Sequence, residues 1–191
     1  MANILYTDGL FEIERKLLRL FHVSEEADIK IFKPRLPTRK DMNPDVGLVW
    51  ALCERTLPNF MTPRNCPRVT YHVGKNTSKE DIEKYLPKGY SHAVIIEKDW
   101  LDLLKSITLY LYEFNSDDFY QQDEIAGYYV SEKIQKPVSQ VVIKNLESEL
   151  ENRNVALITV DNLWNICEKI KKSSFNWSMC RLSNAKEKGK I

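Results

Sequence analysis

The sequence has few of the residues on which common catalytic motifs depend. Its 191 residues include three histidines, four cysteines and six glycines. No C-x-x-C pair, H-E-x-x-H, G-x-S-x-G, P-loop or G-x-G-x-x-G motif occurs, so zinc enzymes, serine hydrolases, P-loop nucleotidases and Rossmann dehydrogenases lose support. We expect no metal site and reduced, mostly buried thiols. A Cys–His nucleophile stays open because its partners can be distant in sequence, but no local signature selects a cysteine.

The chain also lacks an excess of charge of either sign and any long apolar run. Its 28 basic and 27 acidic residues leave a net charge of +1, which gives no general affinity for nucleic acid, so any polyanion site must be local. The longest apolar runs, such as residues 46–52, are too short to span a bilayer, and residues 1–10 lack a secretory signal pattern. We predict a cytoplasmic protein without a membrane partner. Its oligomeric state stays open.

Short segments rich in β-branched and aromatic residues dominate the middle of the chain, and fewer segments have helical spacing. The pattern predicts an α+β fold, a single domain of mixed, mostly antiparallel sheets with a few flanking helices. Strands are expected at 20–23, 29–32, 46–52, 68–73, 92–97, 108–114, 125–130, 138–143 and 155–160. Helices are expected at 12–20, 78–85, 99–106, 146–152 and after a cap at Asp161.

The predicted organisation is an N-terminal helical extension over residues 1–18, one α+β domain over 19–183 and a flexible charged tail over 184–191. Within the domain, residues 33–45 carry three prolines and no periodicity, which makes them a long loop. This loop contains Arg35, Arg39 and Lys40. It is interpreted either as a lid over an anionic ligand, with Arg35 binding the ligand, or as a solvated connection.

The segment Arg19-Leu-Phe-His-Val-Ser24 predicts a short strand that delivers an imidazole and a hydroxyl at its end. Alternation places His22 and Ser24 on one face, and a second strand is expected to bring Trp50 nearby. An aromatic face beside hydroxyl-binding donors suits a heteroaromatic riboside such as nicotinamide ribose. The alternative, which is the more common one for a lone histidine, is a half-buried structural residue.

A polar triplet, Gln122-Asp123-Glu124, precedes the predicted strand at 125–130. We expect Gln122 and Glu124 to alternate onto one face at the entrance of that strand. A carboxylate there can stabilise positive charge that develops on a ribosyl carbon. A polar turn before a strand is the simpler interpretation of the same residues.

In this order the pieces resemble the ADP-ribosyltransferase superfamily, in which a first strand gives a His, a second an aromatic residue or Ser/Thr, and a later strand begins with Glu. The resemblance implies a split sheet of that type. It also implies NAD as a co-substrate, with His22 on a ribose hydroxyl and Trp50 flanking the nicotinamide. Trp50 stands where the family usually has Tyr, and Val23 where Gly or Thr usually follows the His.

The same resemblance assigns the catalytic roles. Glu124 would stabilise the oxocarbenium-like transition state, and Gln122 would orient the substrate as in the Gln-x-Glu variant of the motif. Glu132 is the alternative carboxylate. The lead hypothesis is therefore a transferase or glycohydrolase that cleaves the nicotinamide–ribose bond, with an unidentified acceptor. The alternative is a noncatalytic module that binds a nucleotide, an RNA end or a protein.

Residues 20–181 also resemble a family of uncharacterised bacterial proteins of unknown function. The resemblance is carried by Leu20-Phe-His-Val-Ser-Glu-Glu26, Gly47-Leu-Val-Trp-Ala51, Asn65-Cys-Pro-Arg-Val-Thr-Tyr71, Asp123-Glu-Ile-Ala-Gly-Tyr-Tyr-Val130 and Asn176-Trp-Ser-Met-Cys180. It implies a compact bacterial protein and no particular activity.

Two further groups of residues have interpretations of their own. Arg64 and Arg68 flank prolines, and their guanidinium groups suit a pyrophosphate, although a surface salt bridge is an equal alternative. His72 and His92 are expected to serve structure, and residues 177–180 are expected to be a plug packed on the sheet.

Overall fold

The computed structural model describes residues 18–37 and 42–189. The predicted N-terminal extension therefore lies outside the described residues apart from its last residue, as do Arg39 and Lys40 of the predicted lid. The α+β class is confirmed, with two mostly antiparallel sheets and four α-helices in the described part of the chain. The ADP-ribosyltransferase-like split sheet stays a prediction.

The chain forms two compact units, and it passes between them three times. Unit 1 contains the residues before Thr56 together with Tyr110–Val141, and unit 2 contains Thr56–Leu109 and the residues from Val142 onward. Neither unit is a continuous stretch of sequence. This interleaving agrees with one fold rather than with two domains joined by a linker, and the boundaries 19 and 183 stay a prediction.

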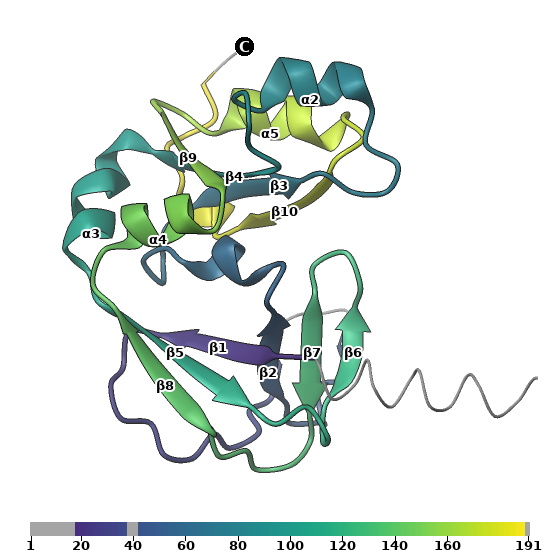
Figure 1. The fold of residues 1–191 in the computed structure, drawn as a ribbon, viewed down its shortest axis with the longest axis vertical. Coiled ribbons are helices and arrows are strands. Elements are labelled where there is room, and N and C mark those ends of the chain that lie inside the picture. Colours follow the sequence, from purple (N-terminus) through teal and green to yellow (C-terminus); the bar gives the residue numbers. More distant parts are fainter. Residues whose placement is uncertain (1–17, 38–41, 190–191) are drawn as a thin grey trace, which may run out of the picture. The chain divides into compact units, whose positions relative to one another are not determined.

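Unit 1 holds, apart from Leu109, Val142 and Ile143, a six-stranded sheet in the order β6-β7-β2-β1-β5-β8 (Figure 1). Strand β1 lies between β2 and β5 and pairs antiparallel with both, so that His22 is opposite Tyr112 of β5. Strands β2, β7 and β6 continue the antiparallel pairing toward one edge. The strands are β1 (Leu20–Ser24), β2 (Val49–Cys53), β5 (Leu109–Phe114), β6 (Tyr120–Asp123), β7 (Tyr128–Ser131) and β8 (Ser139–Ile143).

Unit 2 holds a four-stranded sheet in the order β10-β3-β4-β9. Its strands are β3 (Arg68–His72), β4 (His92–Glu97), β9 (Val155–Val160) and β10 (Asn176–Cys180). Strand β4 pairs antiparallel with β3 and parallel with β9, and all six of its residues are buried. A strand covered on both faces is expected to be mostly apolar, and the central Ala-Val-Ile-Ile of β4 has that composition.

The helices α2 (Lys79–Tyr85), α3 (Leu101–Ser106), α4 (Leu146–Asn152) and α5 (Trp164–Lys171) all belong to unit 2. The predicted Ser78 cap is confirmed, because its hydroxyl accepts the Asp81 N–H. The expected cap at Asp161 is wrong. Asn162 accepts the Trp164 N–H instead, and Asp161 forms an ion pair with Lys98.

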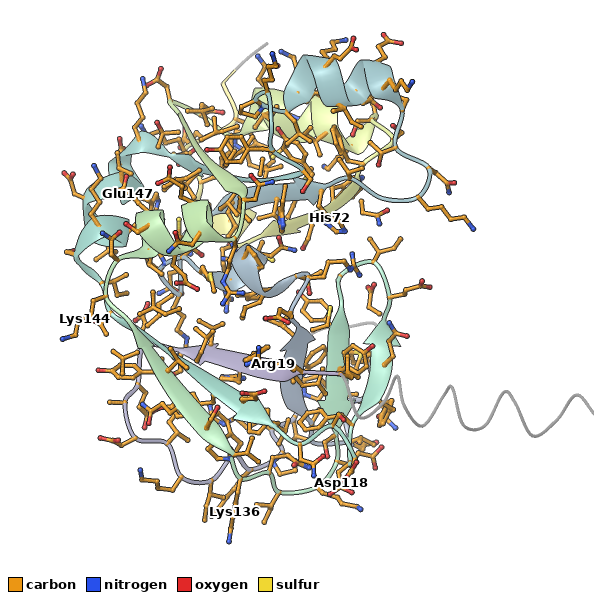
Figure 2. The ribbon with its side chains drawn as sticks, in the orientation of Figure 1. Arg19, His72, Asp118, Lys136, Lys144 and Glu147 are labelled. Carbon is orange, nitrogen blue, oxygen red and sulfur yellow. The ribbon has the colours of Figure 1, made fainter. Side chains whose placement is uncertain are left out.

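The buried residues of the four-stranded sheet divide between two faces. Val69, Tyr71, Ala93 and Ile95 point to one face, where they pack with Cys167 and Ile170 of α5 in an apolar core. The opposite face, called the polar face here, carries Arg68, Thr70 and His72 of β3, His92 of β4, and Asn176, Ser178 and Cys180 of β10. His72 is labelled in Figure 2 on this sheet.

Several elements differ from the sequence prediction. Residues 29–32 form no strand and contribute a single bridge from Phe32 to Gln135. The expected plug is strand β10, whose backbone pairs with β3. The tail predicted as flexible is held as far as Lys188, since Lys186 N–H bonds the Glu97 carboxylate and Asn162 bonds the Glu187 carbonyl.

No helix in residues 18–37 and 42–189 is both long enough and apolar enough to cross a membrane.

Candidate functional site

The structure places His22 and Ser24 on one face of β1, as expected. The His22 ring is half-buried, stands 5.0 Å from the Phe32 ring, and donates from Nδ1 to the backbone carbonyl of Trp50 at 2.9 Å. The Ser24 hydroxyl accepts the Glu26 N–H and so closes the turn that follows the strand. Both side chains therefore take part in local structure.

Trp50 lies on the strand next to His22, but its side chain points to the opposite face of the sheet. The register pairs Phe21 with Leu52, and alternation then puts Trp50 on the face opposite to His22. The Trp50 ring makes an edge contact with Tyr128, with centroids 5.5 Å apart. His22 therefore contacts Trp50 through the Trp50 backbone carbonyl, and the two rings lie on opposite faces of the sheet.

Gln122 and Glu124 belong to the β6–β7 hairpin at the sheet edge. A bulge between Gln121 and Asp123 leaves Gln122 without a pairing partner on β7, and Glu124 follows in the turn. The bulge and turn break the expected alternation, so the two residues do not share a strand face. Both side chains are exposed, and strand β2 lies between this hairpin and β1.

The polar triplet has a structural role in this hairpin. The Asp123 carboxylate accepts the Ala126 N–H, and Gly127 takes a left-handed φ of 65° that suits glycine. The Glu124 backbone carbonyl accepts a hydrogen bond from Arg55 at 2.7 Å. Glu132, the alternative carboxylate, accepts the Tyr120 hydroxyl at 3.2 Å.

The side chain of Arg35 is exposed, while its backbone exchanges two hydrogen bonds with Leu48. Its predicted ligand role stays a prediction. Taken together, the structure joins His22 and Ser24 on one face and leaves Trp50, Gln122 and Glu124 elsewhere in unit 1. It does not assemble the cleft that the NAD hypothesis requires.

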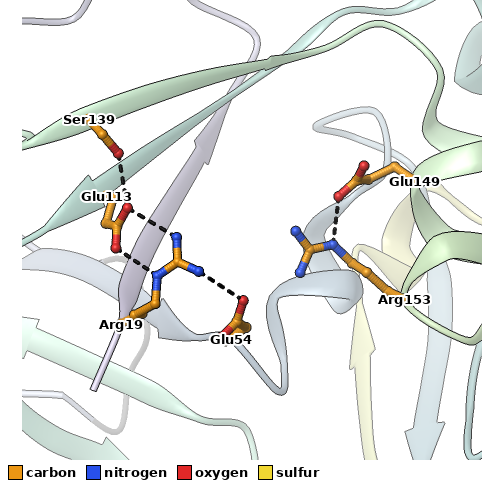
Figure 3. Close-up of polar contacts among 6 residues, drawn as sticks. All are labelled: Arg19, Glu54, Glu113, Ser139, Glu149 and Arg153. Atoms are coloured by element: carbon orange, nitrogen blue, oxygen red, sulfur yellow. Dashed lines mark hydrogen bonds and ion pairs between the residues drawn. The ribbon is translucent and has the colours of Figure 1, made fainter. Parts of the chain in front are cut away.

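Unit 1 contains a charged network that the sequence analysis did not single out (Figure 3). The Arg19 guanidinium forms a bidentate pair with the Glu113 carboxylate, at 2.8 and 3.2 Å, and a third hydrogen bond with Glu54 at 3.3 Å. Ser139 also donates to Glu113. These contacts join the residue before β1 and the residue after β2 with strands β5 and β8. The hydrogen bond from Arg19 lowers the pKa of Glu113. The network is complete without a ligand.

A ligand-sized groove of about 320 Å³ opens in unit 2 between α2 and α5. The two helices are drawn near one another in Figure 1, and Ser174 joins them by donating to the Asp81 carboxylate. The groove is lined by Asp81, Lys84, Tyr85, Asn165, Glu168, Lys169, Lys172 and Ser173.

The groove is lined by three lysines and two carboxylates, and the lysines give it a net positive charge. Its two carboxylates are already engaged: hydrogen bonds from Ser174 lower the pKa of Asp81, and the hydrogen bond from Lys188 lowers the pKa of Glu168. The charges of Lys84 and Lys172 also help to lower the pKa of Asp81 and of Glu168, respectively. Lys84 Nζ lies 5.3 Å from the centroid of the Tyr85 ring. The groove therefore offers three ammonium groups and an aromatic ring.

The sequence analysis missed the groove because its lysines come from helices far apart in the sequence. The available local signal was the basic end of the helix after Asp161, where Lys169, Lys171 and Lys172 follow one another closely. Such a cluster also complements the helix dipole, so by itself it does not indicate a ligand.

Two of the four cysteines, Cys66 and Cys167, are buried. Burial raises the pKa of Cys66 to about 12, which keeps the thiol protonated at neutral pH, and burial also raises the pKa of Cys167. No group of three or more His, Cys, Asp or Glu side chains in the described segments is arranged to hold a metal ion.

Comparison with known proteins gives one match. No curated protein and no solved structure matches the chain significantly, and nothing in these comparisons supports the resemblance to ADP-ribosyltransferases. A family model described as a family of unknown function (DUF6886) matches residues 21–185. These residues contain both sheets, apart from Leu20 at the start of β1, and every predicted site residue. The chain belongs to this family of unknown function, DUF6886.

Proposed function

We propose that the protein is a noncatalytic nucleotide-binding module whose ligand occupies the groove between α2 and α5. The observation that supports the proposal is the lining of that groove, where Lys84, Lys169 and Lys172 surround a space beside the Tyr85 ring. Ammonium groups bind phosphate oxygens, and an aromatic ring can stack on a base. Asp81 and Glu168 also accept hydrogen bonds from Ser174 and Lys188, so the lysines of the groove are not their only partners.

The groove contains no pairing of an activated nucleophile or a general base with a substrate-orienting partner. Asp81 and Glu168 have lowered pKa values, so both are poor proton donors and weak bases at neutral pH. Binding without chemistry is therefore the function that this geometry favours. The NAD-cleaving enzyme stays the rival hypothesis, because NAD is itself a dinucleotide.

The binding test is isothermal titration of the protein with AMP, ADP, ATP, NAD and inorganic phosphate at low ionic strength. We expect at least one nucleotide to bind, with affinity that falls as salt rises. The double variant Lys169→Gln/Lys172→Gln is expected to bind about tenfold more weakly, which corresponds to about 1.4 kcal/mol. Lys171→Gln is the matched control, since Lys171 lies on the same helix but outside the groove lining.

Two results would overturn the proposal. One is the absence of binding by the wild-type protein for the whole panel. The other is release of nicotinamide from NAD by the wild-type protein that disappears in Glu124→Gln and His22→Ala, since that would establish the catalytic alternative.

A further inference from the structure

A second feature lies on the polar face of the four-stranded sheet, on the side opposite to the core that α5 covers. The strand positions on this face carry hydroxyl, imidazole, amide, thiol and guanidinium groups among aliphatic residues. None of these strand positions carries Asp or Glu. Arg68, Thr70, His72 and His92 are all at least nine-tenths buried. Arg68 is the residue of this face with a permanent charge, and buried charges are normally paired.

Arg68 is the charged residue of this face, and it is 4 % exposed. Its Nε donates to the Asn59 carbonyl at 2.5 Å and its Nη1 to the Cys66 carbonyl at 3.0 Å, and the guanidinium lies over the Phe60 ring. These contacts hold the residues from Asn59 to Cys66 against the sheet. They satisfy hydrogen bonds but leave the positive charge unneutralised, since both acceptors are neutral carbonyls.

No carboxylate in the described part of the chain forms an ion pair with Arg68. The buried carboxylate of the same unit, Glu97, points to the other face of the sheet. There it accepts N–H groups from Leu163 and Lys186. The full charge of Arg68 is therefore buried without an anionic partner, an arrangement that costs several kcal/mol in the absence of a compensating anion.

The segment that Arg68 holds contains an independent sign of an incomplete site. Thr62 is 4 % exposed, and its hydroxyl oxygen has no hydrogen-bond partner among the described residues. Buried hydroxyl groups are nearly always bonded, so the Thr62 hydroxyl has a hydrogen bond to offer a ligand. Asn59, whose carbonyl accepts from Arg68, also contacts His92 Nε2 through its side-chain oxygen at 2.7 Å. Arg68, Asn59 and His92 thus form one connected polar group.

We propose that the polar face binds a phosphate-type oxyanion through Arg68, with the Thr62 hydroxyl as a second donor. The guanidinium matches phosphate oxygens in geometry and supplies the charge that the carbonyl acceptors leave unneutralised. This site is independent of the α2–α5 groove, because the two lie on opposite faces of the sheet. Its ligand is either free phosphate or the phosphate group of a monoester.

Equilibrium dialysis of the wild-type protein against labelled inorganic phosphate, at constant ionic strength set with chloride, is the deciding measurement. AMP in a parallel arm separates free phosphate from a phosphate monoester. We expect saturable binding of at least one of the two at one site. We also expect a melting temperature that rises by roughly 5–10 °C at a hundred times the dissociation constant. Absence of saturable binding in both arms overturns the proposal, whatever the variants do.

The variants locate the site. Arg68→Lys keeps the positive charge but loses the planar guanidinium donors that can bind two phosphate oxygens at once, so we expect about tenfold weaker phosphate binding. Thr62→Val is expected to weaken binding severalfold without loss of fold, because it removes a hydroxyl that has no partner. Arg64→Gln is the control and should bind as the wild-type protein does. The AMP arm is repeated with the Lys169→Gln/Lys172→Gln protein, so that binding in the α2–α5 groove is weakened and the remaining binding reports the polar face. Binding that is unchanged in both Arg68→Lys and Thr62→Val would place the anion elsewhere and overturn the proposal.

Discussion

Two arginines, one in each unit, satisfy their hydrogen bonds in opposite ways. Arg19 of unit 1 has a side chain that is 52 % exposed, and it contacts the carboxylates of Glu113 and Glu54. Arg68 of unit 2 is 4 % exposed, and it donates to two backbone carbonyls. The exposed cation is fully paired, and the buried one has no anion. Because buried charges are normally paired, burial alone would predict that Arg68, and not Arg19, contacts carboxylates.

The two carboxylates involved extend the comparison. Glu113 is paired with a cation, whereas the buried Glu97 accepts N–H groups from the backbone of Leu163 and Lys186. In unit 2, Arg68 and Glu97 therefore tie neighbouring segments to the sheet by bonding backbone groups. In unit 1, Arg19 and Glu113 tie strands together by pairing with each other. The difference teaches that a side chain with a complete set of hydrogen bonds can still carry an unneutralised charge, and that of these two arginines only Arg68 has charge to offer a ligand.

The largest effect is expected for Arg68→Met. Methionine keeps much of the side-chain volume, but the carbonyls of Asn59 and Cys66 lose their charged donors. We expect the free energy of unfolding to fall by about 3 kcal/mol. Urea denaturation measures it. A loss below about 1 kcal/mol would mean that Arg68 contributes no more than a surface charge and would remove the contrast with Arg19.

A smaller effect is expected for Glu97→Gln. Glutamine retains one acceptor oxygen, so one of the contacts with the Leu163 and Lys186 N–H groups weakens or breaks. We expect a loss of about 2 kcal/mol in the free energy of unfolding. Amide hydrogen exchange at Lys186 provides a local measurement and should accelerate. Unchanged exchange at this amide would show that the carboxylate does not hold the tail.

Arg19→Met is expected to cost about 1 kcal/mol or less, because partly exposed ion pairs contribute little in water. Sodium chloride at high concentration should reduce the difference between variant and wild type, since it screens exposed charges. Parallel urea titrations at low and high salt check this. A cost equal to that of Arg68→Met would show that the Arg19 network is as important for stability as the buried arginine.

The smallest effect is expected for Glu113→Gln, and it depends on pH. The hydrogen bond from Arg19 lowers the pKa of Glu113 below 4.5, so the folded state favours the ionised carboxylate. This stabilisation is present above pH 4.5 and is lost as the pH falls through the folded-state pKa. The variant should therefore lose less stability than the wild type on acidification from pH 5 to pH 3. Parallel slopes in thermal melts over that range would contradict the pairing.

Much of the fold follows from local pattern. The predicted bounds of the strands at 92–97 and 155–160 and of the helix at 146–152 are those of β4, β9 and α4. Apolar runs, caps and turn residues determined these elements within short windows. Strand β10 was missed as a strand because Asn-Trp-Ser-Met-Cys contains no β-branched residue, and its extended form depends on pairing with β3.

The candidate site was far less predictable. Alternation from Gln122 to Glu124 assumed a regular strand, and neither the bulge nor the Asp123 side-chain bond to Ala126 can be deduced from spacing alone. Arg68 was noted as a possible anion ligand, but its burial and its carbonyl acceptors arise from contacts that depend on the folded loop. The lysines of the α2–α5 groove meet only after both helices pack on the sheet.

The interleaving of the two units bears on how the chain acquires its structure. Strand β1 pairs with β5, which is far along the chain, so that Leu20 lies opposite Phe114. Strand β3 likewise pairs with the distant β10, so that Thr70 lies opposite Ser178. Contacts between such distant residues slow folding, because long loops must close before the pairing stabilises them. On a ribosome, the six-stranded sheet cannot form until the second half of the chain has emerged. The polar face is complete only when almost the whole of the polypeptide has been made.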